Sequence, residues 1–232
     1  MSRSFTFADA QTLEDLQVFL ARAARIEEGS VRLIAGSGVL ATYAAVLYPV
    51  GLLDESPTVL GLRTFALVPG SSGTVDDFDV VVPIRSLLTR LEKAQGERAD
   101  DHGKVGSITI SLPMEVNTVT WAAISPPRGG WRPIAATDAA LLDAAARAGI
   151  EEVANAIPDA VGEQVVRKVR GEVWSRPIPG LEHVPAGAGF AALGLGFLGD
   201  DEVRVFETGP WTRLTTVRGH ILVKRKAWTL SR

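Results

Sequence analysis

The feature that most constrains this chain is a strand–helix–strand unit that occurs twice. The first copy begins at Phe78 with FDVVVPIRSLLTRLEKA and, after a polar spacer, ends at Leu112 with GSITISL. The second copy, from His183 to Glu207, reads HVPAGAGFAALGLGFLGDDEVRVFE. Each copy contains Val-Pro, then apolar residues at helical spacing, then an alternating strand. Proline is well tolerated in the first helical turn, so Val-Pro marks the start of each helix. The repetition indicates a duplicated architecture.

Apolar periodicity predicts the elements around the two copies. Leu13, Leu16 and Phe19 recur at helical spacing, and either Asp9 or Thr12 can cap that helix. The other expected strands are 4–7, a pair within 31–48 around Gly36-Ser37-Gly38, 59–68, 119–124, 131–135 and 173–178. Residues 214–224 are expected to form either a strand pair or one bent strand, with a turn or a bulge at Arg218-Gly219.

Further helices are expected in the second half of the chain. One is capped by Thr137 or Asp138 and closed by Gly149, and another covers 151–170 with a break at Pro158. The polar segment 95–106 is interpreted as a loop. We therefore predict an α+β fold, in which helices lie on one face of antiparallel sheets.

Length and turn residues suggest two domains. The chain has 232 residues, which fits one large or two small domains. The sequence Ser-Pro-Pro-Arg-Gly-Gly at 125–130 is its strongest break. We predict one domain at 1–127 and a second at 128–232.

Composition excludes several kinds of chemistry. The chain has no cysteine, which excludes disulfides, thiolate catalysis and cysteine-ligated zinc. It has no apolar run long enough for a signal peptide or a membrane helix, so we expect a soluble cytoplasmic protein without a membrane partner. The net charge is −3, which does not indicate a general polyanion binder. We expect no cofactor and no metal.

Candidate catalytic and ligand-binding residues are sparse. His102, His183 and His220 lie in separate segments without partners at motif spacing, and we interpret them as ordinary histidines. Glycine-rich segments at 36–38 and 70–73 lack the context of phosphate loops, and we interpret them as turns. The glycines of 187–196 allow either the close approach of a partner or a tightly packed core helix. The remaining candidates are adjacent acids in loops, able to bind a cation but more typical of solvated turns: Asp76-Asp77, Asp100-Asp101 and Asp200-Asp201.

The C-terminal segment carries the strongest charge signal. Residues 211–232 include Arg213, Arg218 and Lys224 and no acid. One interpretation is contact with nucleic acid or an acidic partner, with Trp211 and Trp228 available for stacking. The other is a strand whose outward face is simply basic, which also limits edge pairing.

Three segments of the chain resemble the bacterial beta sliding clamp, the ring that tethers DNA polymerase. They are the second copy with its continuation to residue 225, the segment VVVPIRSLLTRLEKA, and the segment GSITISLPMEVNTVTWAAIS. The resemblance covers 4–127 and 173–226 and is weak at 131–172, where helices replace expected strands. It implies that the predicted domains are clamp-like, the second more divergent. Bacterial clamps have three such domains per chain, whereas archaeal and eukaryotic clamps have two.

The resemblance also implies partners. Clamp helices line the hole and present Lys and Arg to phosphates, which predicts contacts with double-stranded DNA and a homo-oligomer formed by strand-edge pairing. The helix at 186–198 has no basic residue. Residues that fit the DNA-binding role are Arg22, Arg25, Arg85, Arg90 and Lys93 on the helices, with Arg213, Arg218 and Lys224 in the C-terminal segment.

Two functional hypotheses follow. The first is a non-enzymatic clamp-like protein that acts as a DNA-associated or partner-binding scaffold. The alternative is a small-ligand-binding or regulatory α+β protein that does not bind DNA. An enzyme is the least supported possibility, because no catalytic motif is present.

Overall fold

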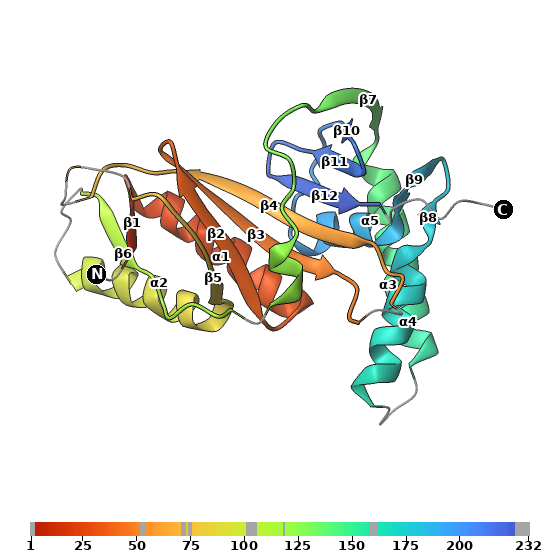
Figure 1. Ribbon diagram of the computed structural model, residues 1–232, viewed down its shortest axis with the longest axis horizontal. Helices are drawn as coiled ribbons and strands as arrows, with labels where there is room; N and C mark the ends of the chain where they lie inside the picture. The colour runs from red at the N-terminus through yellow and green to blue at the C-terminus, as the bar shows by residue number, and fades with distance from the viewer. Residues whose placement is uncertain are drawn as a thin grey trace. The chain divides into compact units, whose positions relative to one another are not determined.

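A computed structural model describes residues 3–51, 54–70, 73, 76–100, 106–117, 119–157 and 162–225 (Figure 1). The chain divides into two compact units. Unit 1 comprises 1–44 and 62–123, and unit 2 comprises 45–61 and 124–232. The assignment of 1–127 and 128–232 as domains stays a prediction. Within the described residues, no helix is both long and apolar enough to cross a membrane.

Unit 1 is built on an antiparallel sheet in the order β5-β2-β3, with β4 beside β3. These strands are β2 (Ser30–Gly36), β3 (Val39–Leu47), β4 (Thr58–Ala66) and β5 (Phe78–Pro83), and both β3 and β4 contribute residues to the two units. Val31, Leu33 and Ala35 of β2 are buried while their neighbours are partly exposed, so one face of the sheet forms the core. A second sheet pairs β1 (Ser4–Phe7) with β6 (Ile108–Ser111).

The first predicted helix is α1, Ala10–Ile26. Of the two expected caps, Asp9 is the residue that acts, because its Oδ1 accepts from the backbone N–H of Thr12 at 2.8 Å. Leu13, Leu16 and Phe19 are fully buried, which confirms the predicted apolar stripe.

The predicted hairpin between β2 and β3 is also confirmed. Ser37 and Gly38 both have positive φ, 52° and 76°, as a two-residue hairpin turn requires.

The first copy of the repeated unit is confirmed as β5, α2 (Ile84–Asp100) and β6. Two expectations near it are wrong. The helix continues to Asp100, so half of the expected loop at 95–106 is helical. The expected strand at 119–124 is a 3-10 helix, η1 (Thr120–Ala123). Arg32 accounts for its position, because its guanidinium binds Asp79 at 2.6 Å and donates to the Ala122 carbonyl at 2.8 Å.

Unit 2 has an antiparallel sheet in the order β12-β11-β10-β7. The strands predicted at 131–135, at Val203 and Val205, and within 214–224 as a pair are confirmed as β7 (Arg132–Thr137), β10 (Val203–Thr208), β11 (Trp211–Thr215) and β12 (His220–Lys224). A short pair, β8 (Pro177–Ile178) and β9 (Leu181–Pro185), leads into α5 (Ala186–Gly194), the helix of the second copy. Figure 1 shows α5 beside the β12-β11-β10-β7 sheet, where α5 contacts β12.

Two more helices, α3 (Ala139–Ala156) and α4 (Glu163–Ser175), pack on each other and on α5 (Figure 1). Asp138 caps α3, with its Oδ1 accepting from Ala140 N at 2.9 Å. The expectation that Gly149 ends this helix is wrong, because the residue lies inside α3 and is buried. The expected strand at 173–178 is also wrong over its first half, since α4 continues to Ser175.

Small residues form the buried face of α5. The expected stripe of Phe190, Leu193 and Phe197 is wrong in part: the first two are only partly buried, and Phe197 is fully buried but follows the helix. A Cβ at Gly189 would lie 2.7 Å from the Leu142 carbonyl oxygen, which no packing allows. Of the two interpretations of this glycine-rich segment, the tightly packed core helix is therefore confirmed. Its buried residues are Gly187, Ala188, Gly189, Ala191 and Ala192.

The contact between α3 and α4 gives a test of this packing. A Cβ added at Gly149 would lie 2.2 Å from Cζ3 of Trp174, whose ring is buried and stacked on Phe190 at 4.4 Å. We expect Gly149→Ala to lower the free energy of unfolding by about 1–3 kcal/mol, as overpacking typically does. Gly96→Ala is the control. Gly96 lies in α2 with open space around it, so alanine should raise stability by roughly 0.5–1 kcal/mol. Urea denaturation measures the free energy of unfolding of both variants. If Gly149→Ala were as stable as the unchanged protein, the close packing of Gly149 on Trp174 would be contradicted.

Candidate functional site

In unit 1 the candidate surface lies on α1 and α2, which pack antiparallel. The backbone N–H of Ile84, at the start of α2, donates to the carbonyl of Gly29, just after α1, at 2.9 Å. At the other end, Nε2 of Gln95 lies 3.4 Å from Oε1 of Glu14. The predicted basic residues Arg25 and Arg85 therefore sit at the same end of the helix pair.

The basic side chains of this helix pair differ in their surroundings. Arg85 Nε lies 2.7 Å from Glu28 Oε1, and Lys93 Nζ lies 3.6 Å from Glu97 Oε1; the two cationic side chains are each 76% exposed. Arg90 donates to Ser111 Oγ at 2.7 Å. Arg25 is exposed and Arg22 is partly buried. Exposed ion pairs of this kind are weak, so the cations remain available to an incoming anion.

The basic residues of unit 2 are placed differently. Arg218 donates from Nη1 to the Leu198 carbonyl at 2.8 Å, which ties the β11–β12 turn to the segment after α5. Lys224 is partly buried and pairs in register with Trp211, which is itself buried and therefore not a stacking surface. Trp228, the other proposed stacking residue, lies outside the described residues, as do His102 and Asp101.

Arg213 is held between two aromatic rings. Its guanidinium carbon lies 4.6 Å from the ring centroid of Trp131 and 4.6 Å from that of Phe206. Its Nε is buried and has no hydrogen-bond partner among the described residues. Burial lowers the pKa of Arg213, and the nearby Arg204 lowers it further. A guanidinium is so basic that Arg213 nevertheless remains a cation near neutral pH.

His220 lies in the same neighbourhood. Its Nδ1 is 3.1 Å from Oγ1 of Thr215, with which it pairs in register. Burial lowers the pKa of His220, and the charges of Arg213 and Arg204 lower it further. The imidazole is therefore neutral at pH 7. The grouping of Arg204, Arg213 and His220 was not predicted from the sequence, because the strands were considered one at a time. Pairing the strand VRVFE with the strand WTRLT would have predicted the proximity of Arg204 and Arg213.

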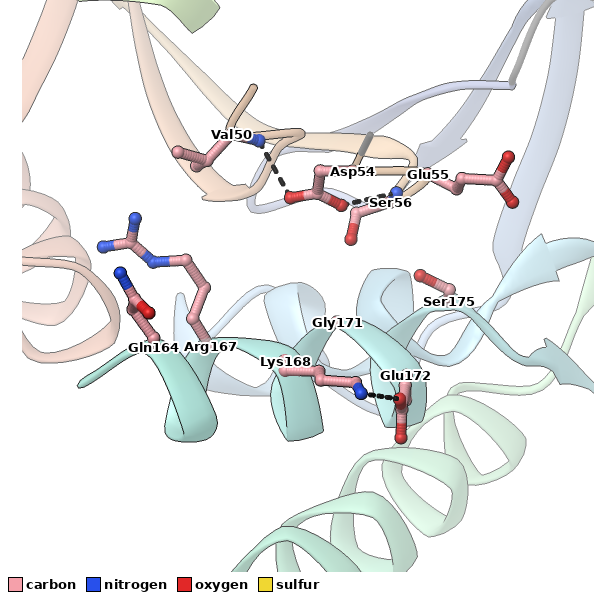
Figure 2. A pocket seen from close by; sticks show the side chains of 10 residues that line it. All are labelled: Val50, Asp54, Glu55, Ser56, Gln164, Arg167, Lys168, Gly171, Glu172 and Ser175. Atoms are coloured by element: carbon pink, nitrogen blue, oxygen red, sulfur yellow. Dashed lines mark hydrogen bonds and ion pairs between the residues drawn. The ribbon is translucent and has the colours of Figure 1, made fainter. Parts of the chain in front are cut away.

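A cavity of about 730 Å³ lies between the segment before β4 and α4, entirely within unit 2. Figure 2 shows Gln164 and Arg167 extending from α4 towards this segment, while Lys168 runs along the helix to Glu172, 4.0 Å away. A Cβ at Gly171 would lie 3.0 Å from Ser56 Oγ, so glycine permits the close approach of the two walls. The segment's lining residues are Val50, Asp54, Glu55 and Ser56.

Asp54 shapes one wall of this cavity. Its two carboxylate oxygens accept from Val50 N at 2.8 Å and from Ser56 N at 2.9 Å (Figure 2). Burial acts to raise the pKa of Asp54, but these hydrogen bonds and the charge of Arg167 outweigh it, so that the net shift is downwards. The wall is therefore anionic at neutral pH and faces the cationic Arg167.

The predicted acid pairs do not form a metal centre in the described residues. Asp201 instead accepts from the backbone N–H of Val217 at 3.2 Å. No cluster of three or more carboxylate or imidazole groups able to hold a metal ion occurs in the parts of the chain that the structure describes.

Comparison with known proteins identifies the fold. Residues 1–109 match a domain of unknown function, DUF8010, and residues 126–228 match another, DUF8185. The DNA polymerase III subunit beta of Borrelia burgdorferi, solved in complex with a natural product, aligns with a TM-score of 0.51 at 10% identity, over 98% of this chain and 66% of that chain. This chain has a sliding-clamp-like fold.

Two other solved clamps give similar alignments. The DNA polymerase III subunit beta of Pseudomonas aeruginosa has a TM-score of 0.48 at 13% identity, covering 99% of this chain and 66% of that chain. The DNA polymerase sliding clamp of Caulobacter crescentus has a TM-score of 0.48 at 13% identity, covering 98% and 67%. The chain thus spans about two thirds of the length of these clamps. No curated protein matches it.

The lowered pKa of His220 predicts a pH dependence. The unfolded state, with a pKa near 6.5, binds a proton more readily than the folded state. Stability from this group is therefore fully present above pH 6.5 and is lost as the pH falls through the lower folded pKa. We expect the His220 resonances in an NMR titration to report a pKa below 6.5. His220→Gln should flatten the loss of stability between pH 7 and 5, whereas an NMR pKa above 6.5 would contradict the assignment.

Proposed function

We propose that this protein is a non-enzymatic, clamp-like scaffold of the cytoplasm that associates with double-stranded DNA or with protein partners. The observation that carries the proposal is the clamp-like fold, matched over nearly the whole chain. We further propose that residues 1–127 and 128–232 are its two clamp-like domains, the second more divergent. The two compact units, and a change of unit at residue 124, support this division.

The basic side chains of α1 and α2 are the proposed DNA contacts in unit 1. Arg25, Arg85 and Lys93 are exposed, and the acids that accompany the last two are exposed as well. Phosphate contacts by such residues are independent of sequence and sensitive to salt. The other proposed contacts are Arg22 and Arg90 in unit 1, and Arg213, Arg218 and Lys224 in unit 2.

Self-association through a strand edge is part of the proposal. β7 is the last strand of its sheet, and five of its six residues are exposed. An exposed edge of this kind offers unpaired backbone groups to a second copy. The outer side of β5, by contrast, is already used in part, because Val116 N donates to the Val81 carbonyl at 2.9 Å. β7 is therefore the favoured edge.

DNA binding can be tested by removing charge from the helix pair. We expect a variant with Arg25→Gln, Arg85→Gln and Lys93→Gln to bind duplex DNA more weakly at low salt. The slope of log K against log salt concentration should become shallower by about 0.9 for each phosphate that the variant no longer neutralises. Fluorescence anisotropy over a salt series measures both quantities.

The matched control removes three charges from exposed ion pairs of unit 2: Arg147→Gln, Lys168→Gln and Arg176→Gln. It should affect binding much less than the helix-pair variant. Equal weakening of DNA binding in the two variants would show that only net charge matters.

Light scattering on the unchanged protein reports the oligomeric state. A monomer at micromolar concentration that binds no DNA at low salt would overturn the proposal.

The cavity in unit 2 favours a second candidate function, the binding of a small polar molecule without DNA. Its volume of about 730 Å³ falls in the range of small-molecule sites. Arg167 and Lys168 on one wall and Asp54 and Glu55 on the other offer both charges (Figure 2). This combination suits a ligand that carries an anionic and a cationic group.

A thermal-shift screen with zwitterionic metabolites tests this candidate. A ligand that binds only the native state raises the Tm, and Arg167→Gln should reduce that rise. Arg147→Gln is a matched control, because both arginines bind an acid one helical turn earlier at 2.6 Å and only Arg167 lines the cavity. The candidate fails if no compound in the screen raises the Tm, or if both variants respond alike.

A further inference from the structure

Three nitrogen-rich side chains gather on one face of the β10–β11–β12 sheet in unit 2. In the strand register Arg204 pairs with Thr215, and Thr215 pairs with His220. Phe206 pairs with Arg213, one step along the same face. The guanidinium carbons of Arg204 and Arg213 lie 5.8 Å and 4.6 Å from the Phe206 ring centroid, so both groups surround a single ring.

Stacking determines which atoms of Arg213 remain available. The rings of Trp131 and Phe206 both lie against the guanidinium at 4.6 Å. Trp131 is itself fixed, since its Nε1 donates to the Pro127 carbonyl at 3.1 Å. Guanidinium N–H groups point outwards in the plane of the group, so stacking does not consume them. The side chain is therefore oriented in advance, and its N–H groups have no hydrogen-bond partner within the described residues.

No acid balances the cluster among the described residues. Arg204 and Arg213 form no ion pair there, although four other arginines of the unit, Arg147, Arg167, Arg176 and Arg225, do. Glu202, two residues before Arg204, and Glu207, three residues after it, are the nearest acids along the chain; within the described residues neither forms an ion pair with Arg204 or Arg213, and Glu207 pairs with Arg225 at 3.0 Å. Two neighbouring cations without an anion are unfavourable, and a bound oxyanion would relieve their repulsion.

We propose that Arg204, Arg213 and His220 form a binding site for a phosphoryl group. A single arginine satisfies both oxygens of a carboxylate, whereas donors from three strands suit a tetrahedral group with more oxygens. The inference adds Arg204 and His220 to the DNA contact proposed for Arg213, but it does not depend on DNA binding, because a free phosphate ester presents the same chemistry as a DNA phosphate. A DNA duplex should compete with pyrophosphate only if the site binds backbone phosphate, and this competition distinguishes DNA from a free phosphate ester.

Binding of pyrophosphate, measured by calorimetry and by NMR of the arginine Nε–H groups in phosphate-free buffer, tests the site. We expect saturable binding with a shift of the Arg213 Nε–H resonance. Arg204→Gln changes an exposed residue and should leave the fold intact while weakening binding about tenfold. Arg213→Lys should also weaken binding, since lysine keeps the charge and loses the planar donors. Arg147→Gln is the control and should bind normally.

Competition distinguishes the two sources. If a short DNA duplex displaces pyrophosphate, the site binds backbone phosphate; if it does not, the site serves a free phosphate ester. Either result supports a phosphoryl site. The inference is wrong if pyrophosphate leaves the Arg213 resonance unmoved, or if Arg204→Gln binds like the unchanged protein. Failure of the helix-pair variant to lose DNA affinity would count against the proposed function and leave this site unaffected.

Discussion

The close approach of α5 to its neighbouring helices is the constraint on which unit 2 depends. Gly189 brings the helix against the Leu142 carbonyl of α3, and Gly187 brings it against the Trp174 carbonyl of α4, where an added Cβ would lie 2.7 and 3.0 Å from the two oxygens. Backbone contacts of this kind tolerate no side chain and leave no room for water. The same contacts place Trp174 on Phe190 and make α3, α4 and α5 one packed layer.

This packing explains why the two copies of the repeated unit differ in charge. The helix of the first copy, α2, buries Ile84, Leu87 and Leu91 and keeps a long exposed face, on which Arg85 and Lys93 lie. The helix of the second copy is covered by two others, so a charged side chain there would be desolvated at high cost. The absence of basic residues from α5 is therefore a consequence of burial. It says nothing against phosphate contacts elsewhere in unit 2.

The parts of the fold that follow from local rules could be predicted from the sequence. Alternating strands, the caps at Asp9 and Asp138 and the hairpin turn at Gly38 each depend on a few adjacent residues. The failures have tertiary causes. Gly149 resembles a helix end, but Trp174 requires a glycine in mid-helix. Trp121 lies in an apolar segment that resembles a strand, but a hydrogen bond from Arg32 to the Ala122 carbonyl holds that segment as a 3-10 turn. The candidate residues on α1 and α2 could be selected from their charge, whereas the partnership of Arg213 with Trp131, 82 residues away in sequence, could not.

The arginine cluster of unit 2 sets unfavourable burial and charge repulsion against favourable stacking on aromatic rings. Burying part of Arg213 disfavours its charge, and the proximity of Arg204 disfavours it further. Stacking on Trp131 and Phe206 offsets part of this cost, because aromatic faces attract cations. Neutral His220 adds no third charge at pH 7. A chain selected only for stability would gain more from an acid at this place than from a second arginine. Arrangements that break a local rule are typical of functional sites, and a bound oxyanion would supply the negative charge that the described residues do not place beside this cluster.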